Sequence, residues 1–180
     1  MIDTRKIREL LVKAPQPPED TLPNGLSTAD CDAFEQRTGI RMPDDLRQWL
    51  AIANGPCIGP GGLYGIRPRR PHLDMEGLLA RFPHWAERQW IPVAGDGCGN
   101  HYVIATQHEY GDGYPVLFVD TSSNSEAPSF IVASDIGHFL VGLLEKELGA
   151  NDWPFNQASV IEADPEIRRF HNLPFPWTAD

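Results

Sequence analysis

Hydrophobic positions in the first 55 residues recur three or four residues apart, which is the spacing of an amphipathic helix. Ile7 and Leu11 fall on one face of a first helix that Asp3 or Thr4 can cap. Residues 15–24 then hold four prolines, and proline lacks the backbone N–H that regular structure needs. The pattern predicts a short N-terminal helix followed by an extended linker.

Two further helices are indicated by the residues at their ends. Ser27 and Asp30 have the spacing of a capping box, and Gly39 suits the left-handed position that ends a helix. The next apolar face begins after Pro43, a residue that favours the first turn, and stops at Asn54-Gly55. We expect one helix from Ser27 to Gly39 and another from Pro43 to about Ala53.

Beyond Gly55 the helical spacing gives way to short apolar runs bounded by Gly, Pro, Asn and Asp, which is typical of strands. We expect strands over residues 63–66, 90–94, 101–106, 114–121 and 130–133. The segment GDGCGN between the second and third of these is longer than a two-residue hairpin turn and predicts a wide glycine-rich loop. Helices are expected over 75–82 and from Ser134 or Asp135 to Gly149.

The order of helices, then strands, then a helix predicts a single α+β domain with a mostly antiparallel central sheet flanked by helices. We divide the chain into an N-terminal helix and Pro-rich linker (1–26), the domain itself (27–150) and a C-terminal extension (151–180). The extension is rich in proline and aromatic residues, which predicts irregular structure packed on the domain. One short helix is expected there, near Glu166 to Phe170.

Charge limits the classes of partner. The 180 residues include 15 Lys and Arg against 25 Asp and Glu, a formal net charge of −10. Nucleic-acid binding draws on cations that replace the counterions of phosphate, and this chain has no excess of cations. Anionic membrane surfaces attract basic segments for the same electrostatic reason. We therefore expect neither a nucleic acid nor a membrane as partner.

Localisation in the cytoplasm is expected from three features. No apolar run approaches the 18 residues of a transmembrane helix. The first residues, MIDTRKIRELLVKAP, are charged throughout and lack the apolar stretch of a signal peptide. The three cysteines are sparse and odd in number, which fits a reducing compartment better than a disulfide-bonded secreted fold.

Five segments occur in an order that resembles a known family. They are PDDLRQWLAIANG, GGLYGI, WIPVAGDGCGNHYVI, YPVLFVDT and SFIVASDIGHFLVGLLE. The part of the chain that the resemblance covers is about Ser27 to Leu148. This succession resembles the SUKH superfamily, the Smi/Knr-type domain. Asn100 stands where members of that family more often carry Asp.

The resemblance implies a non-enzymatic binding protein without a cofactor. Bacterial members of the family resemble immunity proteins that bind and neutralise toxin domains of polymorphic or contact-dependent systems. A negative charge fits a basic toxin such as a nuclease, because an acidic partner can mimic the phosphate backbone. The alternative is a scaffold or regulatory adaptor, the role that fungal relatives resemble.

Candidate partner-binding residues are five acids and one asparagine near the predicted strand ends, together with one tryptophan and one tyrosine flanked by polar residues. Exposed aromatic side chains contribute disproportionately to protein–protein binding. The set is Trp85, Asp96, Asn100, Glu109, Tyr110, Asp112, Asp120 and Glu126. The alternative interpretation of the acids is that they are ordinary solvated loop residues.

Residues capable of chemistry are few and poorly spaced. Cys98, His101 and His108 lack the paired spacing of a structural zinc site, so no metal is expected. Ser134, Asp135 and His138 are close in sequence, but the G-x-S-x-G motif of a nucleophile elbow does not occur. We predict no catalytic residues. A small hydrolase or ligand-binding enzyme using Cys98, His101 or Ser134 remains the second alternative, because a triad is defined by spatial geometry rather than by sequence order.

Overall fold

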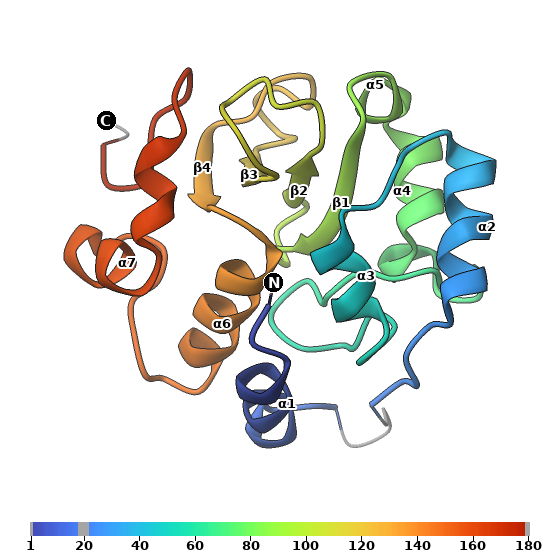
Figure 1. The fold of residues 1–180 in the computed structure, drawn as a ribbon, viewed down its shortest axis with the longest axis horizontal. Coiled ribbons are helices and arrows are strands. Elements are labelled where there is room, and N and C mark those ends of the chain that lie inside the picture. The colour runs from blue at the N-terminus through green and yellow to red at the C-terminus, as the bar shows by residue number, and fades with distance from the viewer. Residues whose placement is uncertain (1, 18–21, 179–180) are drawn as a thin grey trace.

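A computed structural model describes residues 2–17 and 22–178 (Figure 1). Seven α-helices, two 3-10 helices and four strands lie within these residues. The helices are α1 (Thr4–Lys13), α2 (Thr28–Thr38), α3 (Asp44–Leu50), α4 (Met75–Arg81), α5 (Pro83–Glu87), α6 (Ile136–Glu147) and α7 (Gln157–Ala163), with η1 (Pro71–Leu73) and η2 (Pro165–Arg169). The strands are β1 (Trp90–Gly95), β2 (His101–Ala105), β3 (Val116–Val119) and β4 (Phe130–Ala133).

The strands form one antiparallel sheet in the order β1-β2-β3-β4, so each strand pairs with its neighbour in sequence. Central β2 fixes the register, since Tyr102 lies opposite Ala94 of β1 and Phe118 of β3. A bulge between Pro92 and Ala94 interrupts the first pair, at a proline that cannot donate to the ladder. The predicted α+β fold with an antiparallel sheet is confirmed.

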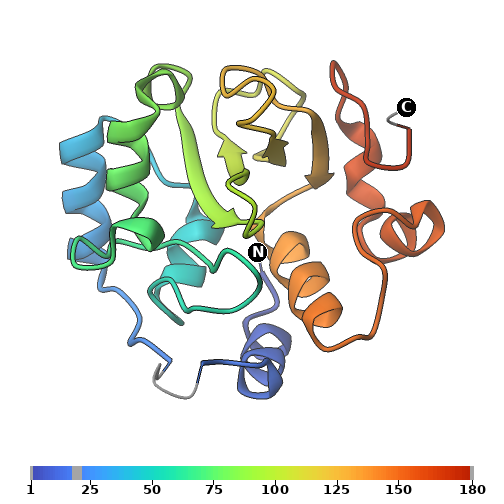
Figure 2. The same cartoon turned by 180° about the vertical axis from the view of Figure 1, so that it is seen from behind.

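The two faces of the sheet pack against different helices. Adjacent residues of a strand point to opposite faces, and β2 places His101 on one face and Tyr102 on the other. The ring of Tyr102 lies 5.0 Å from Phe139 of α6 and 6.3 Å from Trp153, measured between centroids. The ring of His101 lies 5.4 Å from Trp85 of α5. Figure 2 shows the same layers from behind, with α7 and the C-terminal segment beside β4 and α6.

The predicted helix ends are confirmed where a side chain caps the backbone. Asp3 accepts a hydrogen bond from the backbone N–H of Lys6 and begins α1. Ser27 and Asp30 form the complete capping box of α2, which ends at Gly39 with φ of 71°. These local devices contribute about 1 kcal/mol each to stability, and they act within four residues, which is why sequence alone reveals them.

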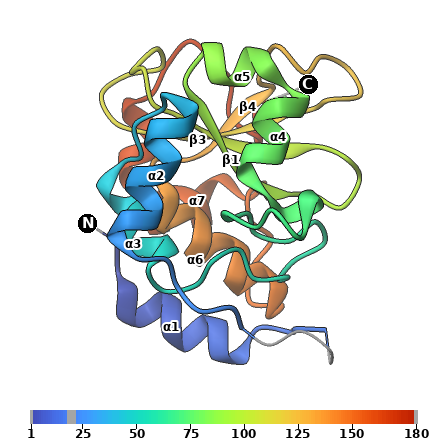
Figure 3. The same ribbon diagram turned by 90° about the vertical axis from the view of Figure 1, so that its right-hand side faces the viewer.

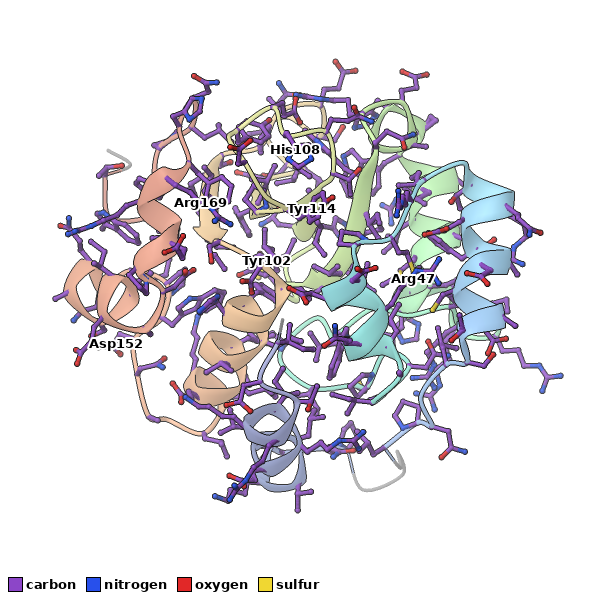
Figure 4. All side chains as sticks on the ribbon, in the orientation of Figure 1. Arg47, Tyr102, His108, Tyr114, Asp152 and Arg169 are labelled. Atoms are coloured by element: carbon purple, nitrogen blue, oxygen red, sulfur yellow. The ribbon has the colours of Figure 1, made fainter. Side chains whose placement is uncertain are left out.

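Helices α1, α2 and α3 complete the core below and beside the sheet. Helices α1 and α3 both pack against α6. Arg47 of α3 bridges Asp32 and Glu35 of α2 at 2.8 Å each, and Figure 4 shows Arg47 between these two helices. Figure 3 places α1 at the opposite end of the molecule from α5.

The predicted strand over 63–66 is wrong. Leu63 and Gly65 form single bridges, with Ala94 and Asp74 respectively, and no continuous ladder. The reason is a competing side chain, because the amide of Asn54 accepts from the N–H of Ile66 and donates to its carbonyl. The helix predicted from Pro43 to Ala53 ends at Leu50, and the strand predicted over 114–121 is shorter, covering Val116–Val119.

The C-terminal extension is more regular than expected. Helix α7 was not predicted, although Asn156 caps it by accepting from the N–H of Ser159. Trp153 and Phe170 are buried, as the packing argument required, whereas Phe155 is 60 % exposed. The backbone N–H of Ile131 donates to the carbonyl of Pro174, so the extension covers part of the free edge of β4. Residues 18–21 of the predicted linker lie outside the described residues.

Candidate functional site

Several of the predicted partner-binding residues meet around Arg88, which follows α5. Its guanidinium donates to Glu109 Oε2 at 2.9 Å and to the carbonyl oxygen of Glu126 at 2.8 Å. It also lies 4.0 Å above the ring of Trp90, whose Nε1 donates to Glu109 Oε1 at 2.7 Å. This Arg88 cluster ties the loop after β2 to the loop after β3, so one cation organises the two loops that flank β3.

The exposure expected for the predicted binding anchors Trp85 and Tyr110 is wrong, because both side chains are buried. Trp85 is fully enclosed, its ring stacked on Phe82 at 4.3 Å, and its Nε1 donates to the carbonyl of Ser125 at 2.9 Å. Tyr110 is 6 % exposed, and burial raises the pKa of its hydroxyl to about 12. Polar neighbours in sequence suggested exposure, but short α5 turns Trp85 inward against the sheet. Both residues support the loops and do not present a surface.

Of the acids at this end, Asp112 and Glu126 have exposed side chains. Both oxygens of Glu109 are used within the Arg88 cluster. Sequence reasoning missed Glu87, the last residue of α5, which is also exposed and directly precedes Arg88. We name Glu87, Asp112 and Glu126 the acidic loop surface.

A basic residue lies beside this surface. Figure 4 shows Arg169 of η2 next to the loop that carries His108 and Tyr114. Its guanidinium lies against Gly113, which follows Asp112, and is paired with Glu166 at 3.2 Å.

A second group of predicted residues forms hydrogen bonds within and between the loops that carry them. Asp96 accepts from the backbone N–H groups of Cys98 and Asn100 and from the Asn100 amide, at 2.7–2.9 Å. Asn100 Oδ1 in turn accepts from the N–H of Thr121. Asp120 accepts from two serine hydroxyls, which lower its pKa to about 2. The glycine-rich segment is therefore a hairpin loop, with Gly97 and Gly99 at positive φ.

The arrangement of Ser134, Asp135 and His138 does not match a hydrolase triad. The Ser134 hydroxyl lies 3.2 Å and the Asp135 carboxylate 3.0 Å from the same ring nitrogen, Nδ1 of His138. A triad needs the nucleophile and the carboxylate on opposite nitrogens of the imidazole. Ser134 is also fully buried, which removes it from any substrate.

A pocket lies beside this histidine, between α1, α6 and α7, with a volume of about 310 Å³. Asp135 and His138 line it, and their hydrogen bond lowers the pKa of the carboxyl and raises that of the imidazole. Asp164 also lines it and is 4 % exposed. Sequence reasoning missed this pocket, because α7 and its position against α6 were not predicted. The only signal was the aromatic extension, which needed a surface to pack on.

Within residues 2–17 and 22–178, no group of three or more His, Cys, Asp or Glu is arranged to hold a metal ion. No helix in the same residues is both long and apolar enough to cross a membrane.

Comparison with known proteins gives one finding. Neither the curated proteins nor the solved structures contain a match to this chain. The SMI1 / KNR4 family (SUKH-1) matches residues 25–142, which run from just before α2 into α6 and include the whole sheet. That range is well over half of the chain and agrees with the resemblance of the five sequence segments. The chain belongs to the SMI1 / KNR4 family (SUKH-1).

Proposed function

We propose that this chain is a non-enzymatic immunity protein, which binds and neutralises a basic toxin domain in the cytoplasm. The observation that carries the proposal is membership of the SUKH-1 family, which implies a protein partner. The formal charge of −10 supports a basic partner, because opposite charges accelerate encounter and disfavour acidic competitors.

The acidic loop surface is the part of the described fold that best suits this role. Its three carboxylates are exposed, and the Arg88 cluster holds the loops that carry two of them. A preorganised surface binds more tightly than a mobile one, because less conformational entropy is lost on association. The buried Trp85 and Trp90 contribute here by making the support rigid.

Action without catalysis is supported by the geometry around Ser134. The hydroxyl is buried and shares Nδ1 of His138 with a carboxylate, so it is not activated as a nucleophile. We therefore propose that the partner is blocked by occupancy of its surface.

The first experiment is capture of partners from the native organism with the purified chain as bait. Parallel washes at low and high salt are followed by mass spectrometry. One dominant basic protein, lost as salt rises, is expected. Co-expression of that protein with the chain must then restore growth of cells that the protein alone kills. Stoichiometric binding without rescue would contradict the immunity role, and several weakly held partners would favour a scaffold or adaptor instead.

Matched charge reversals locate the surface. Glu126→Lys places a positive charge on the acidic loop surface and is expected to weaken the captured complex at least tenfold at low salt. Glu9→Lys makes the same charge change on α1, at the opposite end of the molecule (Figure 3), and is expected to have little effect. Equal effects of the two variants would mean that net charge alone matters and would remove the acidic loop surface from the proposal.

A further inference from the structure

The pocket between α1, α6 and α7 is built mainly by segments outside the family match. Helix α6 supplies one wall, and residues 2–6 and 151–164 supply the others. The family match ends at residue 142, within α6. The pocket therefore lies where segments outside the family match meet α6.

Carboxylates outnumber cations in the lining. Asp3, Asp135, Glu145 and Asp164 face Lys6 and His138. Lys6 is paired with Glu145 at 2.8 Å, and His138 with Asp135 at 3.0 Å. Even with His138 protonated, four carboxylates exceed two cations among the described lining residues, whose summed charge is therefore negative.

One carboxylate at the base of the pocket is incompletely satisfied. Asp164 Oδ2 accepts from the backbone N–H of Ser134 at 2.7 Å, but Oδ1 accepts no hydrogen bond from any described residue. Nδ1 of His138 lies 3.7 Å from Oδ1 and is already bonded to Asp135. A buried carboxylate oxygen without a donor costs several kcal/mol in principle, so it indicates a missing donor.

Most of the remaining lining residues are apolar, and Asn151 and Ser159 are the uncharged polar ones. Val141, Trp153 and Val160 form the walls, while the exposed residues Ser159 and Ala163 lie at the mouth. A volume of about 310 Å³ is at the lower end of the range of small-ligand sites, roughly 300–1,000 Å³. Such a site suits an aliphatic stem with a charged donor at its end.

We propose that this pocket binds an organic cation, an ammonium or guanidinium group on a short aliphatic stem, with Asp164 Oδ1 accepting from the cation. The stem packs between Val141, Val160 and the ring of Trp153. Such a group occurs in free alkylamines and in the lysine or arginine side chains of a protein partner. The inference does not depend on the immunity role, because the test uses no protein partner.

The test is a titration of the full chain with n-butylguanidinium and n-butylammonium, followed by nuclear magnetic resonance. The reporter is the indole N–H resonance of Trp153, assigned with Trp153→Phe. Saturable shifts with either cation are expected, whereas butan-1-ol, of similar size but uncharged, is expected to bind at least tenfold more weakly. Equal binding of butan-1-ol, or no saturable shift with either cation, would overturn the proposal.

Three variants distinguish loss of the Asp164 carboxylate from loss of the folded structure. Asp164→Asn keeps an oxygen for the Ser134 N–H and is expected to weaken cation binding at least tenfold. Glu162→Gln removes the same charge from the exposed side of α7, outside the pocket lining, and is expected to leave affinity within twofold. If Asp164→Asn does not fold, Ala163→Leu obstructs the mouth from an exposed position and must also weaken binding. Unchanged affinity in the folded variants would refute the site.

A final titration identifies whether the cation belongs to a free amine or to a side chain of a protein. N-acetyl-arginine amide presents the same guanidinium on a polypeptide backbone. Affinity equal to that of n-butylguanidinium supports a side chain of a protein partner, and much weaker binding supports a free amine. Both results retain the cation site, which the titration and the Asp164 variants decide.

Discussion

Replacement of Arg88 by Met tests whether one cation holds the two loops of the proposed binding surface. The change removes hydrogen bonds to Glu109 and to the Glu126 carbonyl, and the contact above Trp90. Hydrogen bonds to charged groups contribute about 1.5–3 kcal/mol when buried. We take about 1 kcal/mol for each here because Arg88 is half-exposed. The cation–π contact adds roughly 0.5–1 kcal/mol.

Met retains part of the aliphatic packing, so the net loss is about 2 kcal/mol. For a chain of this size that corresponds to a decrease in Tm of roughly 4–8 °C. Amide hydrogen exchange in residues 107–114 and 122–127 is expected to accelerate more than in the sheet, because these loops lose their shared tether. A double-mutant cycle with Glu109→Gln isolates the ion pair, since Gln still accepts from the Trp90 indole; we expect about 0.5–1 kcal/mol of coupling.

The matched control is Arg5→Met. Arg5 forms an ion pair with Glu9 on α1, but the two side chains are 89 % and 57 % exposed. An exposed pair of this kind contributes less than about 0.5 kcal/mol. If Arg88→Met lowers Tm no more than Arg5→Met does, or if loop exchange is unchanged, Arg88 does not organise the surface and the preorganisation argument fails.

Three further predictions follow from buried groups. Burial lowers the pKa of His101 to about 4, below its unfolded value near 6.5, so the unfolded chain binds the extra proton between these values. Stability to urea is therefore expected to fall by up to about 3 kcal/mol from pH 6.5 to 4, and by less in His101→Gln, which cannot titrate. Gly142→Ala would place a Cβ 2.7 Å from the ring of Trp153 and is expected to cost about 1–3 kcal/mol, with a changed near-ultraviolet dichroism spectrum. Thiol reagents are expected to label exposed Cys98 rapidly in the folded chain and buried Cys31 only on unfolding, as mass spectrometry of timed samples will test.

Local signals account for the parts of the fold that the sequence predicted well. The Ser27–Asp30 capping box, the left-handed Gly39 and the Asp135 cap of α6 each depend on contacts within four residues. Strands β1, β2 and β4 were recognised because buried apolar runs and turn residues bound them. The predicted strand 63–66 failed for a non-local reason, the Asn54 amide that binds the backbone of Ile66.

The site residues were harder to predict because their exposure depends on contacts across the chain. Trp85 is separated by 40 residues from Ser125, the carbonyl that accepts its indole N–H. Glu109 is separated by 21 residues from Arg88. Sequence placed acids in loops correctly but could not distinguish Glu109, whose oxygens are used internally, from Asp112, which faces solvent. Acidic composition therefore predicts the charge of a surface, whereas the residues that form it follow from the folded contacts.

The pocket joins α6, in which the family match ends, to the C-terminal extension. Gly142 on α6 leaves room for the ring of Trp153, which comes from the extension and lies over the helix at that position. Asp164, at the end of α7, in turn accepts from the N–H of Ser134 just before α6. The packing of the extension on α6 thus needs both elements. Helix α6 provides space at Gly142, and the extension provides the carboxylate of Asp164. The second oxygen of Asp164 accepts no hydrogen bond within the described chain. The carboxylate that holds the extension against α6 is therefore also the group that would bind a cation.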